Sequence, residues 1–156
     1  MTWHRPDDSI VIFNPCVRYG VEDGITDVVY IDGEEITYSV KVDVETGIVQ
    51  GDWSSFKGKE EGDHPLKRVQ IPGWKEAVEM VTKGHRRMFF HDLIGWDVTI
   101  DNNGTPVCIE YNIKEPGTKL YQFAGGPYAG QFTEELLAFL LDDEKRKQHL
   151  PRYFRK

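Results

Sequence analysis

The chain has 156 residues, of which 39% are hydrophobic and 12% aromatic, and its 26 acidic and 19 basic residues give a net charge of −7. This length suits a single domain, the aromatic content argues against disorder, and no apolar run is long enough to cross a membrane. The acidic balance disfavours nucleic acid and anionic membranes as partners. The first residues lack the apolar core of a secretory signal, and Cys16 and Cys108 lie within apolar runs, so we expect a cytoplasmic protein with two reduced thiols.

The first third of the chain predicts a meander of short antiparallel strands. Asn14-Pro15 interrupts the first strand, and Asp32-Gly33 and the segment DVETG at residues 43–47 are turn signals between the later ones. The predicted strands cover residues 9–17, 25–30, 35–42 and 48–53.

Residues 54–70 break this pattern, because they are polar, contain two glycines and a proline, and have almost no apolar periodicity. A structureless loop of about 15 residues is uncommon and is often functional, so we interpret it as a mobile loop, for instance a lid that carries His64 over a phosphate site. A plain solvated excursion is the alternative.

Two helices follow. Trp74, Ala77, Val81 and His85 recur at helical spacing. A second helix is expected over residues 133–147, with Thr133 as its N-cap, and residues 148–156 form a basic tail. The elements together predict an α+β fold in one domain over residues 1–147, in which one antiparallel sheet carries both helices.

Asn103-Gly104 is a strong signal for a two-residue type I′ turn between two strands. With these residues at the two turn positions, Ile100 faces Val107 and Asp97 faces Glu110 across the hairpin. One face of the hairpin is then wholly apolar and is expected to be core, with Trp96, Val98, Ile100, Val107, Ile109 and Tyr111.

Asp97 and Glu110 then carry like charges at directly opposed positions, and Asn112 follows two residues further on the same face. Such a pair is destabilising unless a proton or a cation lies between the carboxylates. Two carboxylates and an amide carbonyl are hard oxygen ligands that suit Mg²⁺, which keeps open positions for water and phosphate. The pattern therefore predicts a magnesium site at Asp97, Glu110 and Asn112, whereas a solvated sheet face with tolerated charges is the alternative.

The two hairpin segments, GWDVTI at 95–100 and VCIEYN at 107–112, resemble the C-terminal part of the ATP-grasp fold. They are most similar to the sugar-transfer-associated ATP-grasp family, which is also described as hexapeptide transferase-like. Further residues stand in the order that this family shows, namely His64-Pro65, Ile71-Pro72-Gly73-Trp74, His85, Gly117, Gln122 and Gly126-Pro127.

The resemblance implies that Asp97, Glu110 and Asn112 hold Mg²⁺ on the phosphates of ATP and that Arg18 contacts these phosphates. Enzymes of this fold activate a small carboxylate as an acyl phosphate, which an amine or a thiol then displaces. The implied function is therefore an ATP-dependent ligation in polysaccharide or cell-surface sugar biosynthesis. The family's glycine-rich loop, phosphate-binding lysine and adenine-holding strand are not visible before Asp97, so we expect a partner chain to supply that half and this chain alone not to turn over ATP.

Two other interpretations remain open. A degenerate, non-catalytic ATP-grasp-like binding module or partner subunit would also lack the adenine-binding half. A metal-dependent nuclease would use a similar Asp…Glu-x-Lys hairpin, but Asn112 stands where the lysine belongs and the acidic charge disfavours DNA.

Overall fold

The computed structural model describes residues 1–19, 28–31, 33–55, 58–59, 66–114 and 117–144. The chain divides into two compact units, of which unit 1 comprises residues 1–13, 73–116 and 129–156, and unit 2 comprises residues 14–72 and 117–128. Both units combine antiparallel strands with helices, which confirms the α+β fold. The strands of the described residues form two sheets rather than the single sheet that we expected. The single domain over residues 1–147 stays a prediction.

No helix among the described residues has both the length and the apolar character that a membrane span needs.

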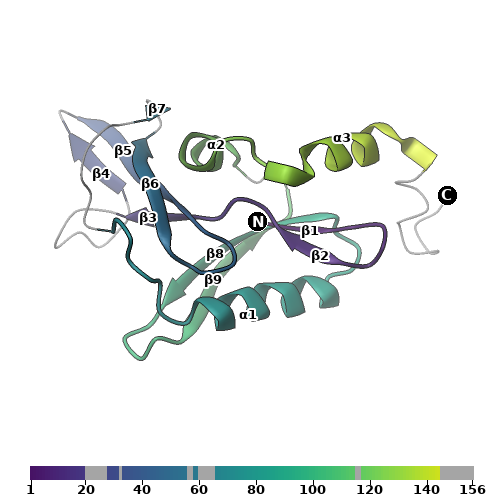
Figure 1. The fold of residues 1–156 in the computed structure, drawn as a ribbon, viewed down its shortest axis with the longest axis horizontal. Coiled ribbons are helices and arrows are strands. Elements are labelled where there is room, and N and C mark those ends of the chain that lie inside the picture. The colour runs from purple at the N-terminus through teal and green to yellow at the C-terminus, as the bar shows by residue number, and fades with distance from the viewer. Residues whose placement is uncertain (20–27, 32, 56–57, 60–65, 115–116, 145–156) are drawn as a thin grey trace. The chain divides into compact units, whose positions relative to one another are not determined.

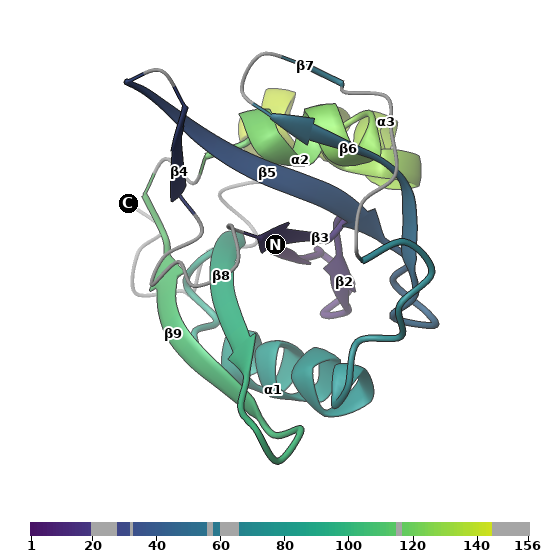
Figure 2. The ribbon, with the colours of Figure 1, turned by 90° about the vertical axis from the view of Figure 1, so that its left-hand side faces the viewer.

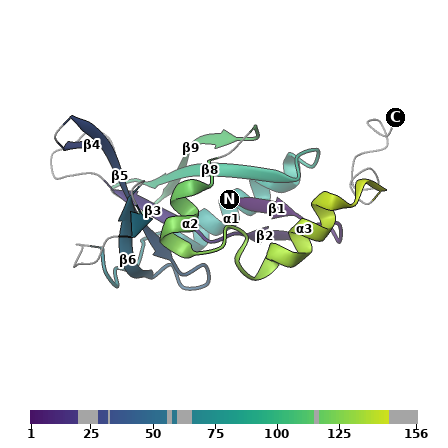
Figure 3. The same ribbon diagram turned by 90° about the horizontal axis from the view of Figure 1, so that it is seen from above.

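Unit 1 is built on a four-stranded antiparallel sheet with the order β2-β1-β8-β9 (Figure 3). Figure 2 shows β8 and β9 side by side as a long hairpin. The strands are β1 (Thr2–His4), β2 (Ile10–Ile12), β8 (Leu93–Ile100) and β9 (Pro106–Asn112), and the helical elements are α1 (Trp74–Arg87), η1 (Gly130–Phe132) and α3 (Thr133–Leu141).

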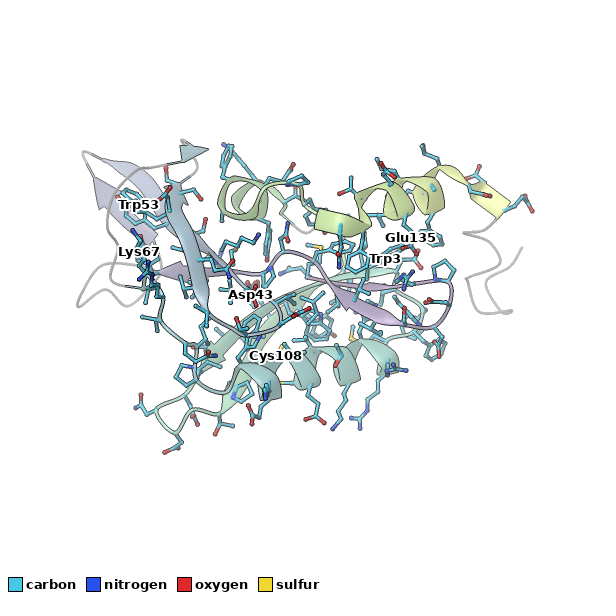
Figure 4. All side chains as sticks on the ribbon, viewed as in Figure 1. Trp3, Asp43, Trp53, Lys67, Cys108 and Glu135 are labelled. Atoms are coloured by element: carbon cyan, nitrogen blue, oxygen red, sulfur yellow. The ribbon has the colours of Figure 1, made fainter. Side chains whose placement is uncertain are left out.

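The two helices of unit 1 lie on opposite faces of this sheet (Figure 1). Successive side chains of β1 alternate between the faces: Thr2 bonds to His85 of α1, whereas Trp3 packs against Phe139 of α3 with ring centroids 5.9 Å apart. Figure 4 shows Trp3 between β1 and α3. Trp3 is fully buried and also packs against Phe13, so the core on this face is aromatic.

The helix predicted from Trp74 to His85 is confirmed as α1. Gly73 precedes it with φ 62°, and a Cβ atom at Gly73 would lie 2.1 Å from the carbonyl oxygen of Gly104. A glycine is therefore needed where the turn of the β8–β9 hairpin meets the start of α1.

The second predicted helix is confirmed as α3, but Thr133 is its first residue and not its N-cap. The 3₁₀ turn η1 runs directly into the helix, so the Thr133 hydroxyl donates back to the Gly130 carbonyl at 2.7 Å rather than accepting from the next turn. Residues 145–147 of the prediction and the basic tail 148–156 lie outside the described residues.

Unit 2 holds most of the predicted meander. The strand predicted over residues 9–17 is divided at Asn14-Pro15 into β2, which belongs to unit 1, and β3. The main sheet has the order β3-β5-β6-β7, and β4 pairs with β5 beside it. Its elements are β3 (Cys16–Tyr19), β4 (Val28–Ile31), β5 (Glu34–Val42), β6 (Val49–Ser55), β7 (Gly58–Lys59) and α2 (Lys119–Gly125). The helix α2 packs against β5 and β6, and Asn14 fixes its end by donating to the carbonyl oxygens of Gly125 at 3.3 Å and Pro127 at 2.7 Å.

The predicted loop over residues 54–70 is wrong at its start. Ser54 and Ser55 are buried at the end of β6, because Ser54 pairs with Ser39 of β5 and their hydroxyl oxygens lie 3.2 Å apart. Gly58 and Lys59 then pair back on β6 as β7. His64 lies outside the described residues, so its role over a phosphate site stays a prediction.

Candidate metal centre

The turn of the β8–β9 hairpin has three residues, not the predicted two. The Asp101 backbone N–H donates to the Thr105 carbonyl at 2.9 Å, and the Gly104 N–H donates to the Asp101 carbonyl. Gly104 has a φ of 81°. The Asp101 carboxylate also accepts the backbone N–H groups of Asn103 at 2.9 Å and of Thr105 at 2.8 Å. This side chain therefore stabilises a longer turn, with Gly104 in the left-handed conformation that such turns require.

A β-bulge restores the predicted pairing further along the hairpin. Next to the turn Val98 pairs with Cys108, one residue away from the predicted register, but Asp97 pairs with Glu110 as predicted. Ile109 is the extra residue between these pairs. Without it, the register of the turn would place Glu110 opposite Trp96, on the other face from Asp97, because side chains alternate along a strand.

The bulge brings the three predicted metal ligands together on one face. The Asn112 side-chain amide donates from its single Nδ2 atom to Asp97 Oδ2 and to Glu110 Oε1, each at 3.3 Å. One neutral amide offers a hydrogen to each carboxylate but adds no positive charge, so the two like charges remain opposed. The ring of Trp96 faces α1, and alternation places Asp97 on the other face, as expected.

This donor set fits a hard divalent cation. The two carboxylates converge on one amide group, and an amide that turns about its terminal bond offers its oxygen where its nitrogen now lies. Among the described side chains, no group of three His, Cys, Asp or Glu residues could hold a metal ion. An amide as third ligand is consistent with Mg²⁺, which uses few protein ligands, rather than with a zinc site.

Burial, with a further contribution from the Asp97 carboxylate, raises the pKa of the Cys108 thiol above its ordinary value. Neither Cys108 nor Cys16 forms a disulfide. The electrostatic effect of Asp97 thus extends to a titratable side chain of β9, which makes Cys108 a probe of charge at the site.

The predicted apolar core face of the hairpin is wrong for β9. Val107, Ile109 and Tyr111 are 44%, 68% and 52% exposed. The longer turn pairs Val107 with Thr99 on the face of Asp97, Ile109 is the extra residue of the bulge, and β9 is an edge strand of the sheet. On β8 the side chains of Trp96, Val98 and Ile100 are partly buried. Alternation in the sequence marks the faces of a strand but not its place in the sheet.

Arg18, the fourth predicted site residue, belongs to unit 2 and lies exposed on β3. It pairs with Ser39 of β5, and Lys41 follows two residues later on the same face.

The model of one protein family, described as sugar-transfer associated ATP-grasp, matches residues 25–135. This range includes Asp97, Glu110 and Asn112 but not Arg18. No curated protein and no solved structure matches the chain significantly.

Proposed function

The chain belongs to the sugar-transfer associated ATP-grasp family, and from this we propose that it binds Mg²⁺-ATP with Asp97, Glu110 and Asn112 as the ligands of the metal. Family membership supports a role in ATP binding of the ligase type. The observation that carries the metal site is the convergence of both carboxylates on the Asn112 amide nitrogen. When bound, Mg²⁺ would neutralise and orient the phosphate oxygens of ATP.

We also propose that Arg18 contacts the phosphates of ATP. The guanidinium group binds phosphate oxygens through two parallel hydrogen bonds and stays charged at any physiological pH. Its exposure on β3 and the presence of Lys41 on the same face support this assignment, since the chain as a whole is acidic.

The reaction we propose is ligation of a carboxylate to an amine or a thiol. A carboxylate oxygen of the substrate attacks the γ-phosphorus of ATP, and the bond to ADP breaks. The amine or thiol then attacks the acyl carbon, loses its proton and displaces inorganic phosphate. The residues named here would bind and orient ATP, and the carboxylate is proposed to belong to polysaccharide or cell-surface sugar biosynthesis.

Calorimetric titration of the full chain with ATP, with and without Mg²⁺, tests the binding function. We expect binding that requires Mg²⁺ and that is lost when Asp97 is replaced by Asn. Equal affinity for ATP with and without Mg²⁺ would contradict the assignment of the metal site.

A phosphate-release assay with ATP and candidate carboxylates separates a ligase from a binding module. We expect the chain alone to bind Mg²⁺-ATP without turnover and a partner chain to restore it, because phosphoryl transfer depends mostly on positioning. Turnover by the purified chain alone would show that no second polypeptide is needed.

A further inference from the structure

The Trp96 ring is fixed on the face of the hairpin opposite to the carboxylates. Its indole Nε1–H donates to the Thr2 hydroxyl at 2.7 Å. The far edge of the ring lies against Gly84 of α1, where a Cβ atom would come within 2.8 Å of the ring carbon Cη2. Gly84 therefore leaves the space that the ring occupies, and the hydroxyl fixes its rotation.

Thr2 is held in turn by His85, which is fully buried. His85 Nε2 lies 2.7 Å from the carbonyl oxygen of His91, which can only accept, so Nε2 carries a hydrogen. In the neutral imidazole with its hydrogen on Nε2, Nδ1 can only accept, so the Thr2 hydroxyl donates to it at 2.7 Å and accepts from Trp96. The chain of donors runs from Trp96 through Thr2 and His85 to His91, and every member is satisfied.

Trp96 is also adjacent to every ligand of the proposed metal centre. Along β8 it directly precedes Asp97, and across the ladder it pairs with Tyr111, which stands between Glu110 and Asn112. The Trp96 and Tyr111 ring centroids are 6.0 Å apart. Fixing this pair on one face fixes the backbone that presents the three ligands on the other.

We propose that Trp96 is a positioning residue for the metal centre, held in place by the Thr2–His85 hydrogen bonds and by the space at Gly84. The inference rests on the proposed function, because it concerns the same metal site. According to this proposal, the hydrogen bonds of Thr2 and His85 contribute to metal affinity and not only to folding stability.

The test is a titration of the full chain with Mn²⁺ alone. Binding is measured by the paramagnetic broadening of backbone amide signals in NMR spectra. Thr2→Val removes the hydroxyl at nearly constant shape, and Thr2→Ser keeps it. Gly84→Ala displaces the Trp96 ring while adding a better helix former. We expect Thr2→Val and Gly84→Ala to bind Mn²⁺ about tenfold more weakly, as for other residues that orient metal ligands, and Thr2→Ser to bind like the wild type.

Two controls separate positioning from stability. Thr82→Ala also adds a helix former to α1, but the Thr82 hydroxyl bonds only within the helix in the described contacts. Phe139→Leu weakens the packing around Trp3 on the other face of the sheet. Thr82→Ala should keep the wild-type Mn²⁺ affinity, and Phe139→Leu should lower the melting temperature without changing that affinity.

The outcomes distinguish the two proposals. Unchanged Mn²⁺ affinity in Thr2→Val and Gly84→Ala, or an equal loss in Phe139→Leu, would overturn the positioning role and leave the proposed function standing. If the wild-type signals around Asp97, Glu110 and Asn112 do not broaden with Mn²⁺, the proposed metal centre is overturned, and the positioning role with it.

Discussion

Asp97 and Glu110 are direct cross-strand partners, although the next residue of β8, Val98, pairs one position out of that register. The bulge at Ile109 accounts for the difference, and the Asn112 amide donates to both carboxylates. Two like charges at such positions weaken the hairpin when no cation is bound. Metal affinity and hairpin stability are therefore expected to respond in opposite directions when one of the charges is removed.

Glu110→Gln tests that opposition. The substitution should weaken binding of Mg²⁺-ATP by about tenfold, because it removes a charged ligand. Without metal it should raise the free energy of unfolding by up to about 1 kcal/mol, since the opposed charges no longer repel. Calorimetry and thermal unfolding measure the two quantities. Glu45→Gln, in an exposed turn of unit 2, is the matched control and should change neither.

Asn112→Asp should have the reverse effect on stability. An ionised aspartate cannot donate to Asp97 and Glu110, and it adds a third negative charge to the face. Without metal we expect the free energy of unfolding to fall by about 1 kcal/mol. With increasing Mg²⁺ concentration the melting temperature should rise more steeply than that of the wild type. A melting temperature equal to that of the wild type without metal would argue against a shared site for these three residues.

The reactivity of Cys108 should report the charge at Asp97. Burial and, to a lesser extent, the Asp97 carboxylate raise the pKa of this thiol, and only the thiolate reacts with alkylating reagents. Asp97→Asn should therefore speed alkylation of Cys108 at pH 8 in a Cys16→Ser background, and Mg²⁺ should speed it in the parent chain. Asp52→Asn, a change in unit 2, should have no effect. If Mg²⁺ leaves the alkylation rate of Cys108 unchanged, the cation binds at another site.

Asp101 predicts a pH effect at the hairpin turn. Hydrogen bonds from the backbone N–H groups of Thr105 and Asn103 hold the pKa of this carboxyl below its ordinary value of 3.8. A lowered folded-state pKa stabilises the native chain above the unfolded-state value, and that contribution is lost as pH falls through the folded-state value. Melting temperatures between pH 2 and pH 6 should therefore fall less steeply below pH 4 for Asp101→Asn than for the wild type. Parallel curves would show that the carboxylate does not act through these bonds.

The sequence allowed the helix α1, the meander of unit 2 and the Asp97–Glu110 pairing to be predicted. The pairing was nevertheless reached through a turn that does not form. The predicted two-residue turn and the observed three-residue turn differ by one register position, and the bulge at Ile109 shifts the strand by one residue in the compensating sense. A pattern of alternating residues contains no signal for either irregularity, although the Asp101 side chain stabilises the longer turn.

The division into two sheets was also beyond sequence reasoning. Strands that follow one another were expected to pair, yet β1 takes β8 as its neighbour. Which strand becomes an edge decides whether Ile109 and Tyr111 are buried, and this depends on partners distant in the sequence.

The pairing of β1 with β8 has a consequence for the order of events during synthesis. Thr2 lies opposite Ile94 in the sheet, 92 residues later in the chain, and residues 14–72 of unit 2 lie between them in the sequence. A ribosome adds roughly 5–20 residues per second, so the first strand waits on the order of ten seconds for its partner. The meander of unit 2 has mostly local pairings and is made first, whereas the sheet that presents Asp97 and Glu110 closes only once β9, residues 106–112, has been made.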